Sequence, residues 1–142
     1  MKNRYILLTV ALVLVLVLGT VVNADMTIRK SGALLLTVDS SGNVRESGRL
    51  VGSIESNGNI RASGRLVGTI SGSGDLRKSG AYLGQVQSNG NLRKNGRLVG
   101  QITNSGTIRK QGRLWGSASS CCSDSERRTV AAAIVFFGEF FD

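Results

Sequence analysis

The chain has 142 residues, a formal net charge of +9, 19 glycines and two cysteines, and it contains neither proline nor histidine. This length allows one domain at most. The lack of histidine removes the usual general base near neutral pH and the commonest metal ligand in proteins.

The first 24 residues have the pattern of a secretory signal peptide. Two basic residues precede an apolar run over residues 6–18, and Val22-Asn23-Ala24 presents small residues at the positions that a signal peptidase reads. The alternative is an uncleaved anchor, because the apolar run is near the lower length limit for spanning a membrane. We expect cleavage after Ala24 and export to the periplasm, the cell surface or the extracellular space.

One phrase, close to Ile-Arg-x-Ser-Gly-Arg-Leu-Val-Gly-x-Ile, recurs through residues 26–116. A turn glycine marks each copy at a spacing of 16 residues: Gly32, Gly48, Gly64, Gly80, Gly96 and Gly112. Six copies at a fixed period indicate a repeat array.

Stacking the copies gives four apolar columns rich in β-branched residues, without a helical period, which predicts short strands. They are Ile28, Val44, Ile60, Leu76, Leu92 and Ile108; Leu34, Leu50, Leu66, Tyr82, Leu98 and Leu114; Leu35, Val51, Val67, Leu83, Val99 and Trp115; and Val38, Ile54, Ile70, Val86, Ile102 and Ala118. Each unit also carries two glycine turns, so the repeat is predicted to be a β-hairpin.

A third glycine column lies within the strands, at Gly52, Gly68, Gly84, Gly100 and Gly116, with Leu36 in the first copy. Strict alternation would place Val67 and Ile70 on opposite faces of a strand. A bulge at Gly68 would insert one residue, return both side chains to one face and bend the hairpin.

The phrase Gly-x-Ile-Arg-x-Ser-Gly-Arg-x-x-Gly-x-Ile, followed by the Phe-rich end Ala131–Phe141, resembles the secreted β-flower proteins of bacteria. The resemblance covers nearly the whole mature chain. It implies hairpin petals around a central axis, in a family with four-fold and five-fold members, and it implies no molecular role. The six arginine-centred copies here depart from a five-fold arrangement.

The array begins and ends on half-repeats. Met26–Lys30 corresponds to the second half of a hairpin and Arg113–Ala118 to the first half. Complete hairpins are then expected between them at 33–46, 49–62, 65–78, 81–94 and 97–110. We expect the two halves to pair, with Thr27 close to Gly116, which closes a flower- or propeller-like ring and hides both strand edges. An open β-solenoid is the alternative.

The predicted fold is therefore all-β with a short C-terminal helix. Residues 25–118 form the repeat domain, 119–125 a linker, and 126–142 an apolar helix that packs on the repeats. Ser123-x-x-Glu126 has the pattern of a capping box. The apolar end is too short to span a bilayer; we expect it to plug or cap the ring, with docking to a membrane surface or another protein as the alternative.

Cys121 and Cys122 lie in the linker. They allow a vicinal disulfide, a cross-link between two chains, or two unpaired thiols. We expect no metal site and no cofactor, because the chain has no histidine and no further cysteine.

Two columns of the repeat carry arginine, and in a ring they would form one or two circular belts. The candidate anion-binding residues are Arg29, Arg45, Arg61, Arg77, Arg93 and Arg109 in the first column, and Arg49, Arg65, Arg97 and Arg113 in the second. Arginine suits phosphate and carboxylate, but such belts are also typical of a solvated surface. Nucleic acid is disfavoured by the predicted export and by the lack of interleaved aromatic residues.

No catalytic set is present, because no histidine activates a serine and no acidic residue recurs in one column. We expect a non-enzymatic, exported protein. One function is a structural or scaffold module of the cell envelope, and the alternative is a binding module for anionic ligands such as acidic glycans or phosphate groups.

Overall fold

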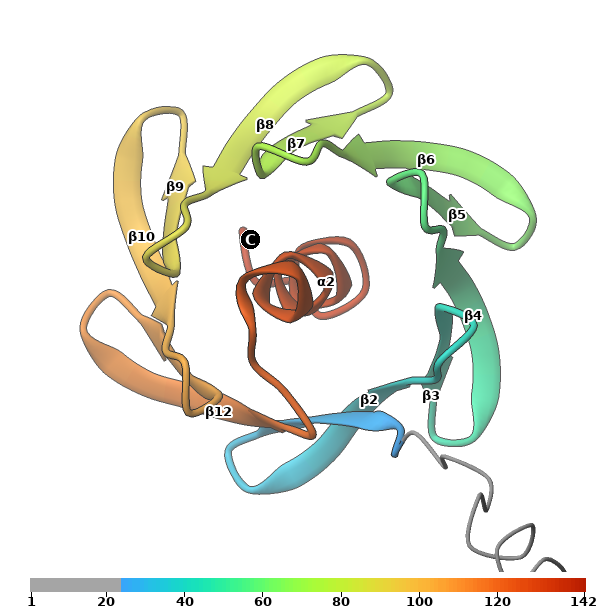
Figure 1. Cartoon of the computed structure of the whole chain (residues 1–142), viewed down its shortest axis with the longest axis horizontal. Helices are drawn as coiled ribbons and strands as arrows, with labels where there is room; N and C mark the ends of the chain where they lie inside the picture. The colour runs from blue at the N-terminus through green and yellow to red at the C-terminus, as the bar shows by residue number, and fades with distance from the viewer. Residues whose placement is uncertain (1–23) are drawn as a thin grey trace, which may run out of the picture.

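The structure is a computed structural model that describes residues 24–142, so the expected signal peptide lies outside the described residues except for Ala24. In residues 24–142, twelve antiparallel strands form a closed barrel around one helix, α2 (Figure 1). The strands are β1 (Met26–Lys30), β2 (Ala33–Val38), β3 (Asn43–Glu46), β4 (Arg49–Ile54), β5 (Asn59–Ala62), β6 (Arg65–Ile70), β7 (Asp75–Lys78), β8 (Ala81–Val86), β9 (Asn91–Lys94), β10 (Arg97–Ile102), β11 (Thr107–Lys110) and β12 (Arg113–Ser119).

The hairpins are divided differently from the sequence prediction. Each odd-numbered strand pairs along its full length with the next even-numbered strand, as β5 does with β6. The contact between β2 and β3 covers only two residue pairs. The hairpins are therefore β1–β2, β3–β4, β5–β6, β7–β8, β9–β10 and β11–β12, and the predicted units such as 33–46 are the weaker connections between hairpins.

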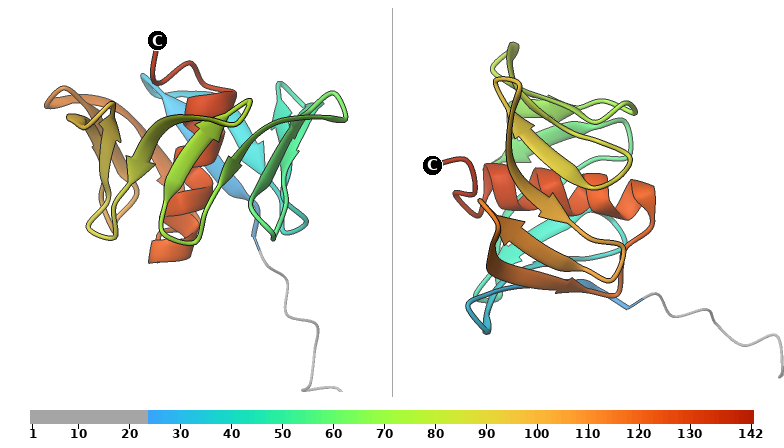
Figure 2. Two further views of the ribbon diagram at one scale, coloured as in Figure 1. Left: turned by 90° about the horizontal axis from the view of Figure 1, so that it is seen from above. Right: turned by 90° about the vertical axis from the view of Figure 1, so that its left-hand side faces the viewer.

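The two kinds of turn lie at opposite ends of the ring. The Ser-Gly-type turns spread outward at the end where the chain terminates, which we call the tip end (Figure 2). At this end Ser31 and Gly32 both have positive φ, 50° and 81°, the conformation of a two-residue hairpin turn whose twist matches the strands. The turns such as 57–58 lie at the other end, the base end.

The ring closes between the first and last strands, as predicted. β1 pairs with β12, with Thr27 opposite Ser119 and Lys30 opposite Gly116. The predicted neighbour of Thr27 was Gly116, so the closure is confirmed but the register is shifted by three residues. The shift arises because β12 runs on to Ser119 and pairs from its far end.

Each hairpin contains a bulge, which lies next to the inner glycine in every hairpin except the first, where Leu36 takes its place. Ile60 pairs with Gly68 and Arg61 with Leu66, so Val67 is the unpaired residue. The sequence predicts the bulge at Gly68, whereas the structure places it one residue earlier, at Val67, which is only half-buried while Ile70 is buried. Glycine is needed beside the bulge for a different reason, which is close packing in the lumen.

Of the two arrangements expected for the C-terminal helix, a plug or a cap, the structure shows the plug: helix α2 (Asp124–Phe136) runs through the lumen (Figures 1 and 2). It begins two residues before the predicted 126, because Ser123 is the N-cap of a complete capping box with Glu126. Five consecutive residues, 130–134, are buried. Since five residues cover more than one turn, every side of the helix faces the barrel wall.

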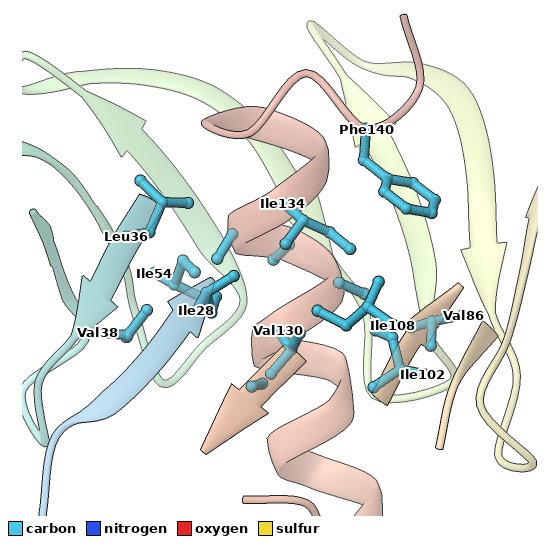
Figure 3. Packing of buried hydrophobic residues seen from close by; sticks show 14 of the residues in the cluster. Ile28, Leu36, Val38, Ile54, Val86, Ile102, Ile108, Val130, Ile134 and Phe140 are labelled. Atoms are coloured by element: carbon cyan, nitrogen blue, oxygen red, sulfur yellow. The ribbon is translucent and has the colours of Figure 1, made fainter. Parts of the chain in front are cut away.

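The lumen is filled by strand and helix side chains together. Figure 3 shows Ile28, Leu36 and Ile54 on one side of the helix and Ile108 on the other, with Ile134 between them. Small residues at 131–133 keep the helix slim enough for the barrel. Fully burying each large apolar side chain contributes about 1.5–3 kcal/mol, so this shared core is the main source of stability.

Four phenylalanines of the C-terminal segment pack directly on four glycines of the wall. A Cβ built on Gly100 would lie 2.6 Å from Cζ of Phe140 and 2.5 Å from the Arg109 carbonyl oxygen. The same arrangement joins Gly52 to Phe137, Gly68 to Phe136 and Gly84 to Phe141. In the first hairpin Leu36 replaces the glycine and is itself buried.

We expect Gly100→Ala to lower the free energy of unfolding by about 1–3 kcal/mol, because the added methyl overpacks the site. Chemical denaturation measures this, with Gly72→Ala as the control, since a Cβ at Gly72 meets open space. Phe140→Ala should cost less in the Gly100→Ala background than in the wild type. Equal stability of the two glycine variants would contradict the packing account.

A second prediction tests ring closure. In a background without Cys121 and Cys122, Thr27→Cys with Ser119→Cys should oxidise readily and stabilise the protein by about 2–4 kcal/mol. The control pairs Thr27→Cys with Ser117→Cys, two residues away on the same strand, where the diagonal separation is too long to bridge. Mass spectrometry measures the oxidation and chemical denaturation measures the stability. Equal oxidation of both pairs would show that the register between β1 and β12 is not fixed.

A third prediction concerns the start of α2. Hydrogen bonds with the Ser123 side chain and then its backbone N–H lower the pKa of Glu126. This contribution to stability is present above the ordinary carboxyl pKa of 4.5 and is lost as the pH falls through the lowered value. Ser123→Ala should cost about 1 kcal/mol at pH 7, and the difference from wild type should shrink at pH 3. Ser125→Ala, which keeps both capping bonds, should match the wild type at both pH values.

Candidate anion-binding surfaces

The first arginine column lies on the outer face of the barrel. Arg61 follows Ile60, whose side chain fills the lumen, and successive strand residues face opposite sides. Its cross-strand partner is Leu66, so both side chains share the outer face. The same pairing joins Arg29 to Leu34, Arg45 to Leu50, Arg77 to Tyr82, Arg93 to Leu98 and Arg109 to Leu114.

The second arginine column lies on the opposite face of the hairpins. Arg97 pairs with Lys94 and Arg113 with Lys110, and both lysines lie over rings of the lumen. The Lys94 ammonium is 5.8 Å from the Phe141 ring centre and that of Lys110 is 5.4 Å from Phe140. The inner face at the tip end therefore carries Arg49, Arg65, Arg97 and Arg113. The expected belts are two distinct surfaces separated by the sheet.

The lysines of the tip end also hold the chain terminus. Lys110 Nζ donates to the carbonyl oxygen of Asp142 at 2.9 Å, and Lys94 Nζ donates to that of Phe141. These cations therefore serve the packing of the C-terminal segment, which distinguishes them from the exposed arginines beside them.

The outer arginines differ in how far acidic neighbours neutralise them. Arg61 Nε donates to Glu55 Oε1 at 2.5 Å. Arg45 lies near Asp39, and the pKa of Asp39 is lowered chiefly by the backbone N–H of Asn43, with a smaller contribution from Arg45. Arg93 instead bonds the neutral Gln87 at 3.1 Å, and among residues 24–142 Arg109 makes no ion pair.

The leucine column is a surface feature that the apolar pattern did not reveal. Leu50, Leu98 and Leu114 expose 59%, 56% and 69% of their surface. The sequence held a signal for this, because two adjacent apolar residues such as Leu66 and Val67 cannot both face inward in a regular strand. The bulge assigns Leu66 to the outer face.

Cavities occur at the base end as well as in the outer wall. One has a volume of about 430 Å³ and lies beside the first turns of α2, between Ile54, Ile70 and Arg128. The Arg128 guanidinium at its edge is bonded to Asp124 at 2.6 Å. This cavity therefore combines core side chains with turn hydroxyls and a cation that is already paired.

Cys121 and Cys122 are joined by a disulfide between β12 and α2. Among residues 24–142, no group of three or more metal-ligating side chains is present and no polar or charged residue is buried. In the same range, no helix has both the length and the apolar composition to cross a membrane.

No family model matches the sequence, and no curated protein or solved structure is significantly similar to it.

Proposed function

We propose that this chain is a non-enzymatic, exported module of the cell envelope, in which a rigid ring of hairpins presents arginine to anionic ligands. The observation that carries the proposal is the placement of the exposed arginines on both faces of the hairpins around a lumen filled by the chain's own C-terminal segment. Because the lumen is occupied, binding is assigned to the exposed surfaces of the hairpins, which are the outer wall of the ring and the spreading tips.

The proposal includes a β-flower architecture with six petals of 16 residues. The closed barrel of hairpins, the outward spread of the tips (Figure 2) and the regular spacing of the turn glycines support it. Export after Ala24 is supported by the signal-like N-terminus, and the vicinal disulfide suits an oxidising compartment.

Electrostatic attraction is the physical basis of the binding. Exposed cations repeated at equal radius raise the local concentration of polyanions, and arginine bonds carboxylate, sulfate and phosphate with its planar fork. The exposed arginines contribute little to stability, about 0–1 kcal/mol per exposed pair. Their number is therefore better explained by ligand binding than by folding.

Heparin resin tests the proposal. The mature protein should bind at low salt and elute as the salt screens its charges. Replacing Arg65, Arg97 and Arg113 by glutamine should lower the eluting salt concentration with little change in melting temperature. The same three positions changed to lysine keep the charge and should retain the binding. A wild-type protein that passes through the resin at low salt would contradict the proposal.

A further inference from the structure

Two pockets in the outer wall are built from equivalent residues on opposite sides of the ring. The first lies between hairpins β3–β4 and β5–β6 and includes Leu50, Ser53 and Arg61. The second lies between β9–β10 and β11–β12 and includes Leu98, Gln101 and Arg109. Every residue of the second follows its counterpart by 48 positions, as Leu98 follows Leu50. A pocket that recurs in this way is a product of the fold.

Strand pairing explains why a pocket opens at this place. β10 pairs with β11 only from Gly100 onward, where Gly100 is opposite Lys110 and Gln101 is opposite Arg109. Before that point the hairpin tips spread apart, and the residues around the bulge are left uncovered. The Val99 carbonyl oxygen accepts a hydrogen bond from the Gln111 backbone N–H at 2.9 Å, which fixes the neighbouring tip against the bulge.

The walls of the pocket carry three kinds of group. The lining includes the exposed aliphatic side chain of Leu98 and the cation Arg109, and Gln101 is the cross-strand neighbour of Arg109. Asn91 and Gln111 add further amide groups at the edge. The cavity volume is about 280 Å³, and about 330 Å³ in the equivalent pocket, near the lower limit of ordinary ligand sites.

This combination selects a ligand with an apolar face, several hydroxyl groups and one negative charge. We infer that the inter-hairpin pockets bind single sugar rings of an acidic polysaccharide, with the ring's C–H face on leucine, its hydroxyls on the amides and its carboxylate or sulfate on arginine. The inference rests on the proposed anion binding and names its site and ligand class. A cluster of phosphates would call for more than one cation per pocket, and stacked bases would call for an aromatic lining.

The two pockets differ in charge and in hydrogen-bonding groups. Arg61 is already bonded to Glu55, whereas Thr103 takes the place of Glu55 beside Arg109. The Arg109 pocket also has Gln101 and Gln111 where the other has Ser53 and Ser63. Among residues 24–142 the Arg109 guanidinium has no acidic partner within ion-pair distance. The Leu98–Arg109 pocket is therefore assigned as the stronger site.

Isothermal titration of the mature protein with a galacturonate tetrasaccharide tests the inference, with a sulfated dextran oligomer as the second acidic probe and unmodified dextran as the neutral one. Arg109→Gln should weaken the binding of at least one acidic probe by about tenfold, the loss expected for one charged hydrogen bond. Leu98→Ala should weaken it by roughly the same factor, because it removes the apolar surface that the sugar ring covers. Arg61→Gln is the matched control and should change it less than threefold, about 0.65 kcal/mol. Comparison of the two acidic probes distinguishes carboxylate from sulfate recognition.

The outcomes separate this inference from the broader proposal. If Arg109→Gln and Leu98→Ala bind both acidic probes as the wild type does, the pockets are not the site, even where heparin is still retained. The same conclusion follows if the wild type binds heparin but neither acidic oligosaccharide. If the wild-type protein binds neither the acidic oligosaccharides nor heparin, the proposed anion binding itself is overturned. Circular dichroism confirms that each variant is folded; both substituted side chains are exposed, so folding should be preserved.

Discussion

The fold depends on the packing of the C-terminal segment into the lumen of the ring. Residues 130–134 are buried on every side of α2, and the phenylalanines that follow lie against glycines of the wall. Without this segment the inward side chains of twelve strands would border an open channel. The wall glycines and the phenylalanines therefore depend on each other, because a Cβ at each of these glycines would occupy the space of a phenylalanine side chain.

Closure of the ring is the second half of the same constraint. A barrel has no free strand edge, and here the last pairing joins β1 to β12 from opposite ends of the sequence. The chain then continues from β12 through the disulfide into the lumen. Closure and filling are thus coupled, since the strand that completes the wall also delivers the helix.

A filled lumen also directs function to the exterior. The polar and charged side chains of residues 24–142 all lie outside the buried core. The outer face pairs each arginine of the first column with an aliphatic or tyrosine side chain, and the bulge leaves space between neighbouring hairpins for a ligand. The same bulge that bends each hairpin thus shapes the pockets.

Much of this architecture could be predicted from the sequence, because the repeat imposes the same local rules on every hairpin. The strand content, the bulge beside Gly68, the closure of the array and the capping box at Ser123 all follow from turn, alternation and capping chemistry. The hairpin boundaries were predicted wrongly, because both turns of the unit contain glycine and sequence alone does not show which pair of strands is longer.

Other features depend on contacts between segments that are distant in the chain. The predicted partner of Thr27 is three residues from the observed one, because the register of two distant strands is set by which side chains the folded barrel buries. Gly100 is required by Phe140, which lies far away in the sequence and packs directly on it. The pocket formed by Leu98 and Arg109 arises between two hairpins, so no single repeat contains it.

Truncation with complementation tests the dependence of the ring on its core segment most directly. A chain ending at Ser119 should lose its cooperative unfolding transition and bind apolar dye, and a synthetic peptide of residues 120–142 should restore the transition when added. A truncated chain that unfolds cooperatively at the wild-type temperature, with or without the peptide, would contradict the account.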